Sequence, residues 1–302
     1  MTAQDTFPTL KSNGHTLDTS ARRMGRLVAS DPGTSIESLR EQFAAQGYLW
    51  LKGLLPREGV LRFRERFFAS LAPAGLLKPG TSPRDGIYSG SSEDNQRIAK
   101  TMHEIVRWSA YESFCLQEPI WMFYERLFDG APYLHKRKLI RYTKPQEASS
   151  TGAHYDLVYL RAGTDRVATS WIPIGDCPIE MGGLVYLEGS HVAGRQMEKE
   201  FSALNADLSR EDQISAYNKS MSATGWLTKD LPALAEKWDS RWLVADYEAG
   251  DMVIHSAYMI HAATGNDVHD GTMRLSTDIR FQRVSDEVDA RWNNHYSMDD
   301  ML

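Results

Sequence analysis

The stretch from His154 to His191 reads HYDLVYLRAGTDRVATSWIPIGDCPIEMGGLVYLEGSH and indicates the fold class. Its runs of β-branched and aromatic residues, at His154–Leu160, Val167–Ile174 and Leu184–Leu187, are separated by Gly, Pro and Asp. Many short strands with turn residues between them are typical of a sandwich, barrel or jelly roll. Runs of the same character lie outside the stretch, at Lys138–Tyr142, Trp242–Tyr247, Met252–Ile260 and Arg274–Val284.

The residues before 133 have a helical pattern instead. Thr34 and Glu37 are spaced as in a capping box, and an apolar periodicity follows them. Val60–Leu71 reads as an amphipathic helix and Asn95–Phe128 as a long helical region, whereas Gly47–Leu55 reads as a strand. We therefore predict an α+β protein with a helical front half packed on a β-rich back half.

The chain length of 302 residues allows one or two domains. Residues 1–33 are polar and rich in turn-forming residues, so we expect a flexible N-terminal arm. Residues 34–302 are expected to form one domain, with helical support from 34–132 and a β core from 133–302. A polar, helical insertion interrupts the β core at about 193–241.

The composition excludes several function classes. With 34 basic and 40 acidic residues, the net charge is −6, which argues against nucleic-acid binding. No apolar run approaches the roughly 20 residues that a membrane span needs. The N-terminus lacks the apolar core of a signal peptide, and two cysteines are too few for a disulfide framework. We expect a soluble, cytoplasmic protein without membrane partners.

A candidate metal site begins with His154 and Asp156. Residues two apart on a strand point to the same face, which would bring this imidazole and this carboxylate together. With one distant histidine they would form the facial triad that binds Fe(II) and leaves positions open. Both His255 and His261 lie on a predicted downstream strand and are candidates for the third ligand.

A candidate anion site follows on the next predicted strand. Arg274 and Ser276 share one face of this strand, and an arginine with a hydroxyl at that spacing would bind a carboxylate. Arg280 shares this face as well. It could bind an anionic substrate or balance Asp278, and the sequence leaves this open.

The order of these motifs resembles the phytanoyl-CoA dioxygenase family of Fe(II)/2-oxoglutarate oxygenases. The resemblance covers most of the chain and rests on seven segments in the family's order. They are GYLWLKGLLP (47–56), TGAHYD (151–156), WIPIGD (171–176), GGLVYLEGSH (182–191), GDMVIHSAYMIH (250–261), RLS (274–276) and ARW (290–292).

The resemblance implies a double-stranded β-helix, a cupin-like jelly roll buttressed by helices. The polar insertion at 193–241 and the loop at 79–94 are candidate lids over its mouth. It implies that His154, Asp156 and His261 bind iron. The family places its distal histidine eleven residues after the glycine of the Gly-Asp pair, which selects His261 over His255.

The resemblance also implies a binding site for 2-oxoglutarate. Arg274 would pair with the distal carboxylate of this cosubstrate, helped by Ser276. Thr151 and Trp171 match positions that line the same pocket. Fe(II), 2-oxoglutarate and O2 would then be the cofactor and cosubstrates.

The expected reaction is oxidation of a small organic molecule, with hydroxylation as the default and desaturation, cyclisation or rearrangement as alternatives. One rival hypothesis is a cupin-like metal protein or isomerase that does not use 2-oxoglutarate. Another is a catalytically inactive scaffold, against which the intact His-Asp-His set argues. The family name is no claim about the substrate, and nothing in the sequence indicates a homo-oligomer.

Overall fold

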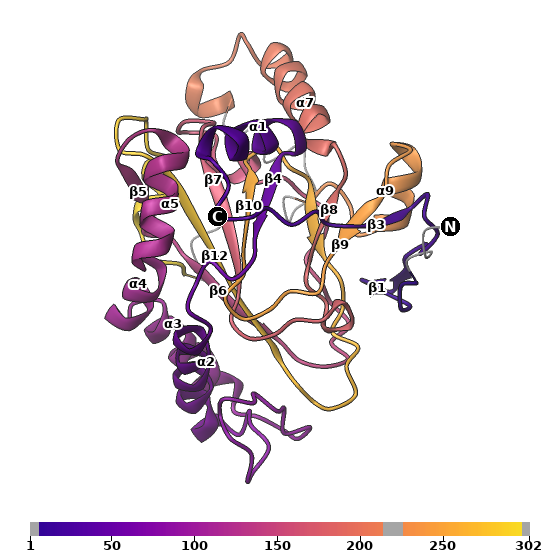
Figure 1. The fold of residues 1–302 in the computed structure, drawn as a ribbon, viewed down its shortest axis with the longest axis vertical. Helices are drawn as coiled ribbons and strands as arrows, with labels where there is room; N and C mark the ends of the chain where they lie inside the picture. The colour runs from indigo at the N-terminus through magenta and orange to yellow at the C-terminus, as the bar shows by residue number, and fades with distance from the viewer. Residues whose placement is uncertain (1–5, 214–225, 298–302) are drawn as a thin grey trace.

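The computed structural model describes residues 6–213 and 226–297 and contains two facing β-sheets with helices around them (Figure 1). The larger sheet has six strands in the order β4-β10-β7-β12-β5, with β6 also paired to β12, and every pair is antiparallel. These strands are β4 (Tyr48–Leu51), β5 (Pro132–Leu134), β6 (Leu139–Thr143), β7 (Ala168–Pro173), β10 (Met252–Ser256) and β12 (Arg274–Arg283).

The smaller sheet has four strands in the order β11-β8-β9-β3. They are β3 (Met24–Arg26), β8 (Leu184–Leu187), β9 (Trp242–Val244) and β11 (His261–Ala263). A separate hairpin pairs β1 (Lys11–Ser12) with β2 (His15–Thr16).

The helices of the front half cover the outer face of the larger sheet (Figure 1). They are α1 (Ile36–Gln46), α2 (Arg57–Leu71), α3 (Asn95–Ile105), α4 (Ser109–Cys115) and α5 (Glu118–Phe128). Ile254 of β10 and Ile279 of β12 are fully buried in one cluster with Phe67 and Tyr124 of these helices. Helix and sheet thus share one core, as the sequence predicts.

The inner faces of the two sheets meet in a second cluster. Tyr48 of β4 stacks on Tyr186 of β8 with ring centroids 5.3 Å apart. Trp171 of β7 and Leu243 of β9 are buried in the same cluster. Because side chains alternate across a strand, the neighbours of the outer-face residues Ile254 and Ile279 point into the space between the sheets.

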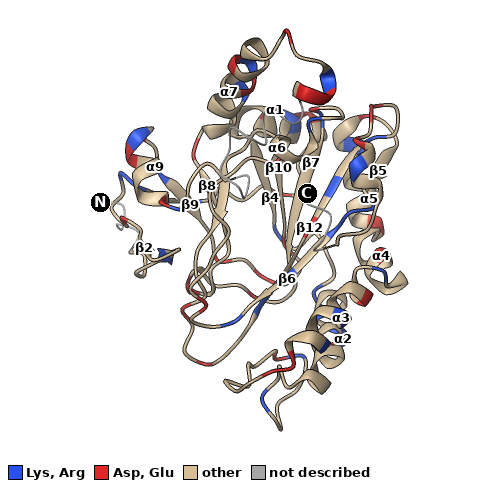
Figure 2. Ribbon diagram, turned by 180° about the vertical axis from the view of Figure 1, so that it is seen from behind, with Lys and Arg blue, Asp and Glu red and all other residues tan. Residues whose placement is uncertain are grey.

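The remaining helices described are α6 (Leu157–Leu160), α7 (Ser190–Leu204) and α9 (Leu231–Lys237), with 3-10 turns at Ala72–Ala74, Ile179–Met181 and Ala290–Asn293. The helical prediction for 193–241 is confirmed for the part occupied by α7 and α9, and residues 214–225 lie outside the described residues. Acidic and basic positions are mixed along both helices (Figure 2).

Two strand predictions are wrong in part. In the run His154–Leu160, only His154 forms a β-bridge. The chain then enters α6, at whose start the amide of Tyr159 donates to the carbonyl of Asp156. The run Met252–Ile260 ends as a strand at Ser256. A turn follows, in which the Met259 amide donates to the Ser256 carbonyl, and the chain then enters β11 of the smaller sheet.

Two details of the front half also differ. The α1 N-cap is Ser35, whose side chain accepts from the amide of Ser38, so Thr34 is not the capping residue. The predicted helical region Asn95–Phe128 is three helices, with breaks before Ser109 and Glu118.

The prediction of a flexible arm at residues 1–33 is wrong for residues 6–33, and residues 1–5 lie outside the described part. β3 pairs in parallel with β9 and extends the smaller sheet. Leu10, Leu17 and Met24 are buried and belong to one hydrophobic cluster. Apolar side chains spaced along an otherwise polar segment were enough to anchor it. Among the described residues, no helix is long and apolar enough to cross a membrane.

Replacement of Met24 by alanine tests this anchoring. Met24 is 1% exposed, so Met24→Ala should lower the free energy of unfolding by about 2–4 kcal/mol. Val28, in the same segment, is 55% exposed, and Val28→Ala should change it by less than about 0.5 kcal/mol. Urea unfolding of the two variants gives the comparison, and equal small effects would show that the segment does not contribute to the fold.

Candidate metal centre and cosubstrate pocket

The structure brings His154, Asp156 and His261 together between the sheets. One ligand atom of each residue lies within 4.8 Å of the other two, and all three residues are buried. His154 and His261 pair directly through two backbone hydrogen bonds, with N···O distances of 3.0 and 2.9 Å, and their ring centroids are 4.3 Å apart. Residues 107 positions apart are therefore held side by side by the backbone itself.

Both histidine rings are oriented by backbone carbonyls. Nδ1 of His154 lies 2.9 Å from the Gly152 oxygen, and Nδ1 of His261 lies 2.9 Å from the Met259 oxygen. A carbonyl only accepts, so each Nδ1 carries the proton and each Nε2 keeps its lone pair. Each Nε2 lies 3.8 Å from Oδ1 of Asp156. Two imidazoles and one carboxylate so arranged fit the donor set of a non-haem Fe(II) site.

Asp156 is the most enclosed member of the set, with 0% exposure. Burial alone would raise its pKa, but Arg280, His255 and His261 outweigh this and hold the pKa well below its usual range. Arg280 Nη2 donates to Oδ1 at 3.1 Å, and the Thr169 hydroxyl donates to Oδ2. The carboxylate is thus ionised and oriented.

The two histidines His154 and His261 are neutral because burial disfavours the charged imidazolium. Burial lowers the pKa of His154, and it lowers that of His261 well below the ordinary value, with His255 and His154 adding to the effect on His261. Neutral imidazole is the form that binds a metal. The protein therefore presents all three side chains in the protonation states that a metal ion requires.

Arg274 and Ser276 lie on the inner face of β12, as predicted from their spacing. Arg274 is 8% exposed, and its Nη2 donates to the Thr143 hydroxyl at 2.8 Å. Among the described residues, its Nε and Nη1 have no hydrogen-bond partner. A buried guanidinium with unused donors fits an anionic group such as the distal carboxylate of 2-oxoglutarate.

The two less specific predictions have different surroundings. Thr151 is half-buried, and its carbonyl accepts from the Ala263 amide at 3.1 Å, which places it beside β11. Trp171 is on the inner face of β7, in register with Asp278 of β12. Its ring packs on Tyr247, at 4.9 Å between centroids. Both border the space between the sheets.

The sequence did not reveal three contacts of Asp156. Arg280, which the sequence left open, donates to this carboxylate, and its guanidinium carbon lies 4.4 Å from the ring centroid of Trp292. Thr169 is in register with both Arg280 and His255, so the three approach Asp156 from adjacent strands. Nε2 of His255 lies 3.4 Å from Oδ2. Only the strand register could have indicated this cluster.

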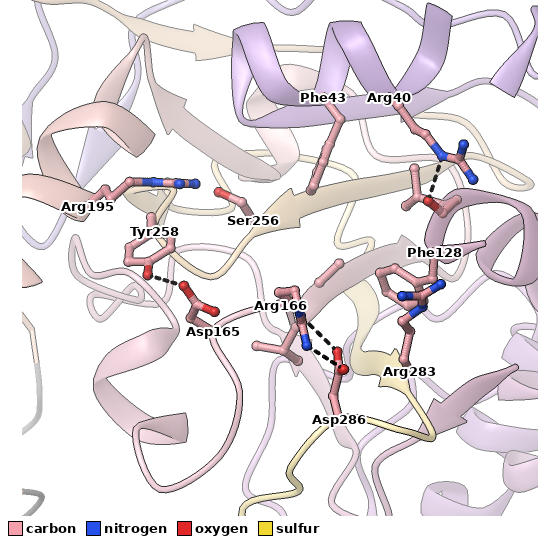
Figure 3. A pocket seen from close by; sticks show the side chains of 13 residues that line it. Arg40, Phe43, Phe128, Asp165, Arg166, Arg195, Ser256, Tyr258, Arg283 and Asp286 are labelled. Atoms are coloured by element: carbon pink, nitrogen blue, oxygen red, sulfur yellow. Dashed lines mark hydrogen bonds and ion pairs between the residues drawn. The ribbon is translucent and has the colours of Figure 1, made fainter. Parts of the chain in front are cut away.

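The cavity drawn in Figure 3, with a volume of about 350 Å³, is a different place. Its lining includes Ser256 and Ala168, which follow His255 and precede Thr169 in the chain. Adjacent strand residues point to opposite faces, so this cavity lies on the outer side of the sheet wall whose inner side contacts Asp156.

The chain matches a known protein family over most of its length. The profile of the family described as "Phytanoyl-CoA dioxygenase (PhyH)" matches residues 43–270, about three quarters of the chain. The chain belongs to this family. The recognition made from the sequence motifs is therefore confirmed.

Two relatives are curated as "1-deoxypentalenic acid 11-beta-hydroxylase", from Streptomyces arenae and Streptomyces exfoliatus. They are 27% and 26% identical over 255 residues, which is 82% of each chain. The relatives and the family identify an oxidoreductase of the Fe(II)/2-oxoglutarate-dependent dioxygenase type, as the sequence motifs indicated.

Solved structures share the fold. The epimerase SnoN, in complex with Fe3+, alpha ketoglutarate and nogalamycin RO, is 19% identical with a TM-score of 0.51, over 84% of this chain and 85% of SnoN. EctD from S. alaskensis is 14% identical with a TM-score of 0.54, over 97% of this chain and 93% of EctD. The fold is thus the cupin-like fold of non-haem oxygenases, with mixed helices and sheets.

One further histidine has a strongly altered environment away from the triad. His135 is 1% exposed, and its Nε2 lies 2.8 Å from the side-chain oxygen of Gln282. Burial lowers the pKa of His135 to about 4, although the bond to Gln282 opposes this. No sequence motif includes His135, and the structure buries it.

This shift predicts a pH dependence of stability. Between pH 6.5 and pH 4 the unfolded chain binds a proton at this histidine while the folded protein does not, so the free energy of unfolding falls as the pH falls. Other buried histidines contribute as well, so the comparison must be with a variant. His135→Gln should lose roughly 2–3 kcal/mol less than the parent over this range. Parallel slopes in urea unfolding at several pH values would contradict the assignment.

Proposed function

We propose that this enzyme oxidises a small organic molecule, by default through hydroxylation, with His154, Asp156 and His261 as its iron ligands. One observation carries the proposal: two lone-pair imidazole nitrogens and an ionised carboxylate converge between the sheets. When bound there, Fe(II) with 2-oxoglutarate and O2 supplies the oxidising power for C–H chemistry, and 2-oxoglutarate ends as succinate and CO2.

The protein's own contribution to cosubstrate binding is an oriented cation. Arg274 is held by Thr143 and directs its remaining donors into the space between the sheets. Ser276, two residues along β12, adds a hydroxyl on the same face. In a buried site a charge-assisted pair is stronger than at the surface, so Arg274 would supply most of the affinity for the distal carboxylate. Thr151 and Trp171 are proposed to complete the walls of this pocket.

The substrate is proposed to be a small metabolite or a natural-product intermediate. The curated relatives are named as hydroxylases of 1-deoxypentalenic acid, and SnoN was solved in complex with nogalamycin RO. A further solved structure, of 20% identity and TM-score 0.52, is named as the carbocyclase SnoK from nogalamycin biosynthesis. The sheets and the seven sequence motifs support three finer predictions. They are a double-stranded β-helix core, a single domain that takes in β3 in addition to the predicted part from residue 34 onward, and a covering role for the insertion at 193–241. The cytoplasmic location also stays a prediction.

The proposed activity is tested by succinate release from 2-oxoglutarate with Fe(II) and O2, measured across a library of terpenoid acids, polyketides and small amino-acid derivatives. Substrate-dependent succinate, with equimolar oxidised product, supports the proposal. A protein that binds Fe(II) but neither consumes nor binds 2-oxoglutarate would instead be a metal-binding protein or an isomerase of this fold.

Replacement of the iron ligands tests the metal site. His154→Ala, Asp156→Ala and His261→Ala should each abolish the weak visible absorption band that Fe(II) and 2-oxoglutarate give together without O2, because a three-ligand site does not retain the metal with two. The exposed His269 provides a matched control, and His269→Gln should leave the band unchanged. Retention of the band in His261→Ala would show that His255, and not His261, is the third iron ligand.

Replacement of Arg274 tests the cosubstrate site. Arg274→Gln removes the buried charge and should weaken 2-oxoglutarate binding by about 2–3 kcal/mol, or roughly 30- to 140-fold. Iron binding should persist in this variant, since Arg274 is not a ligand. The KM for 2-oxoglutarate and an Fe(II) titration separate the two effects, with the exposed Arg97→Gln as control. An unchanged KM for 2-oxoglutarate would show that Arg274 does not bind this cosubstrate.

A further inference from the structure

Helix α7 is joined to the metal-binding segment through a buried carboxylate. Glu198 of α7 is 7% exposed. Its Oε1 accepts from the Tyr155 hydroxyl at 2.8 Å, and its Oε2 accepts from Arg161 Nε at 3.1 Å. Arg161 Nη2 donates to Oε1 as well. The Glu198 carboxylate thus accepts three hydrogen bonds.

Tyr155 connects this carboxylate to the iron ligands. It is the residue between His154 and Asp156, and it is 0% exposed. Its hydroxyl engages α7, whereas Asp156 engages Arg280 and Thr169. The position of Tyr155 therefore sets where the backbone presents the ligands on either side of it.

The same helix also contacts the segment that leads to His261. The Ser190 hydroxyl accepts from the Ile260 amide at 3.0 Å. A Cβ atom on Gly194 would lie 2.2 Å from the Tyr258 carbonyl oxygen, so only glycine allows the helix to approach so closely. Arg195 stacks over the Tyr258 ring at 4.8 Å (Figure 3).

We propose that α7 is a brace that positions both halves of the iron site, with Glu198 and Tyr155 as positioning residues on one side and Gly194 on the other. The brace holds the segment of His154 and Asp156 at a set distance from the segment of His261. None of these residues touches the reacting atoms. The proposal rests on the ligand assignment made above.

The chemistry of the contact favours this role over simple packing. Burying a carboxylate and a guanidinium costs desolvation energy that apolar side chains of similar volume would not cost. A buried carboxylate that accepts several hydrogen bonds restricts geometry more than apolar contact does. Glu198 is such a carboxylate, with three bonds from Tyr155 and Arg161, and Tyr155 lies between two of the metal ligands in the chain.

The test is Co(II) binding to the metal-free protein, read from the dissociation constant and from the visible spectrum of the bound ion. Tyr155→Phe removes one hydroxyl and leaves the charges balanced. It should weaken Co(II) binding about tenfold and change the spectrum. Tyr111→Phe is the matched control, because Tyr111 is also 0% exposed and its hydroxyl makes one buried bond, to Thr277 at 2.6 Å. The control should bind Co(II) as the parent does.

Gly194→Ala tests the other side of the brace independently and should also weaken binding and alter the spectrum. Its control is Gly59→Ala in α2, where a Cβ atom meets nothing closer than 3.9 Å. Thermal unfolding of every variant accompanies the titrations. If Tyr155→Phe and Gly194→Ala lower only the melting temperature, and the constant and spectrum match the parent, the brace does not exist.

His154→Ala separates this proposal from the one on which it rests. If Co(II) binding survives His154→Ala, the ligand assignment fails and the brace fails with it. If binding is lost there but is normal in Tyr155→Phe and Gly194→Ala, the ligand assignment stands and only the brace is overturned.

Discussion

The backbone pair between His154 and His261 is the contact on which the site depends. Two hydrogen bonds join these residues outside any longer strand ladder, and each ring is then turned by a carbonyl two residues before it in the chain. Backbone hydrogen bonds in a buried setting tolerate little displacement, since an unpaired amide there is costly. The nitrogens of His154 and His261 are therefore oriented first by main-chain geometry, and the contacts of α7 then hold the two segments that carry the ligands.

Charge balance between the sheets is the second constraint. Asp156 is fully buried as an anion, and Arg280 is its nearest cation. Arg274, at the start of the same strand, has no such carboxylate partner among the described residues, and its Nε and Nη1 make no hydrogen bond there. One arginine of β12 thus stabilises the protein's own carboxylate, while the other is available for that of a cosubstrate. The strand period of two places both on one face.

The sequence predicted the element types well where the pattern was long and periodic. The helices over the outer face and most strands of the back half lie where expected. The failures at Met252–Ile260 and in residues 6–33 share a cause, because local pattern does not show which sheet a segment joins. The segment from Met252 to His261 contains no Gly or Pro, yet its two histidines, His255 and His261, belong to different sheets. The isolated apolar residues of the N-terminal segment, such as Met24, likewise do not indicate that this segment pairs with β9.

Residue identity alone establishes which imidazoles, which carboxylate and which guanidinium are available, and that Arg274 and Ser276 share a face of their strand. Those properties follow from residue type and from a local period of two. The tertiary structure alone decided that Thr169, His255 and Arg280 surround Asp156 and that α7 contacts Tyr155. These contacts depend on the register between strands and helices far apart in the chain, and register is set by the packing of the whole core.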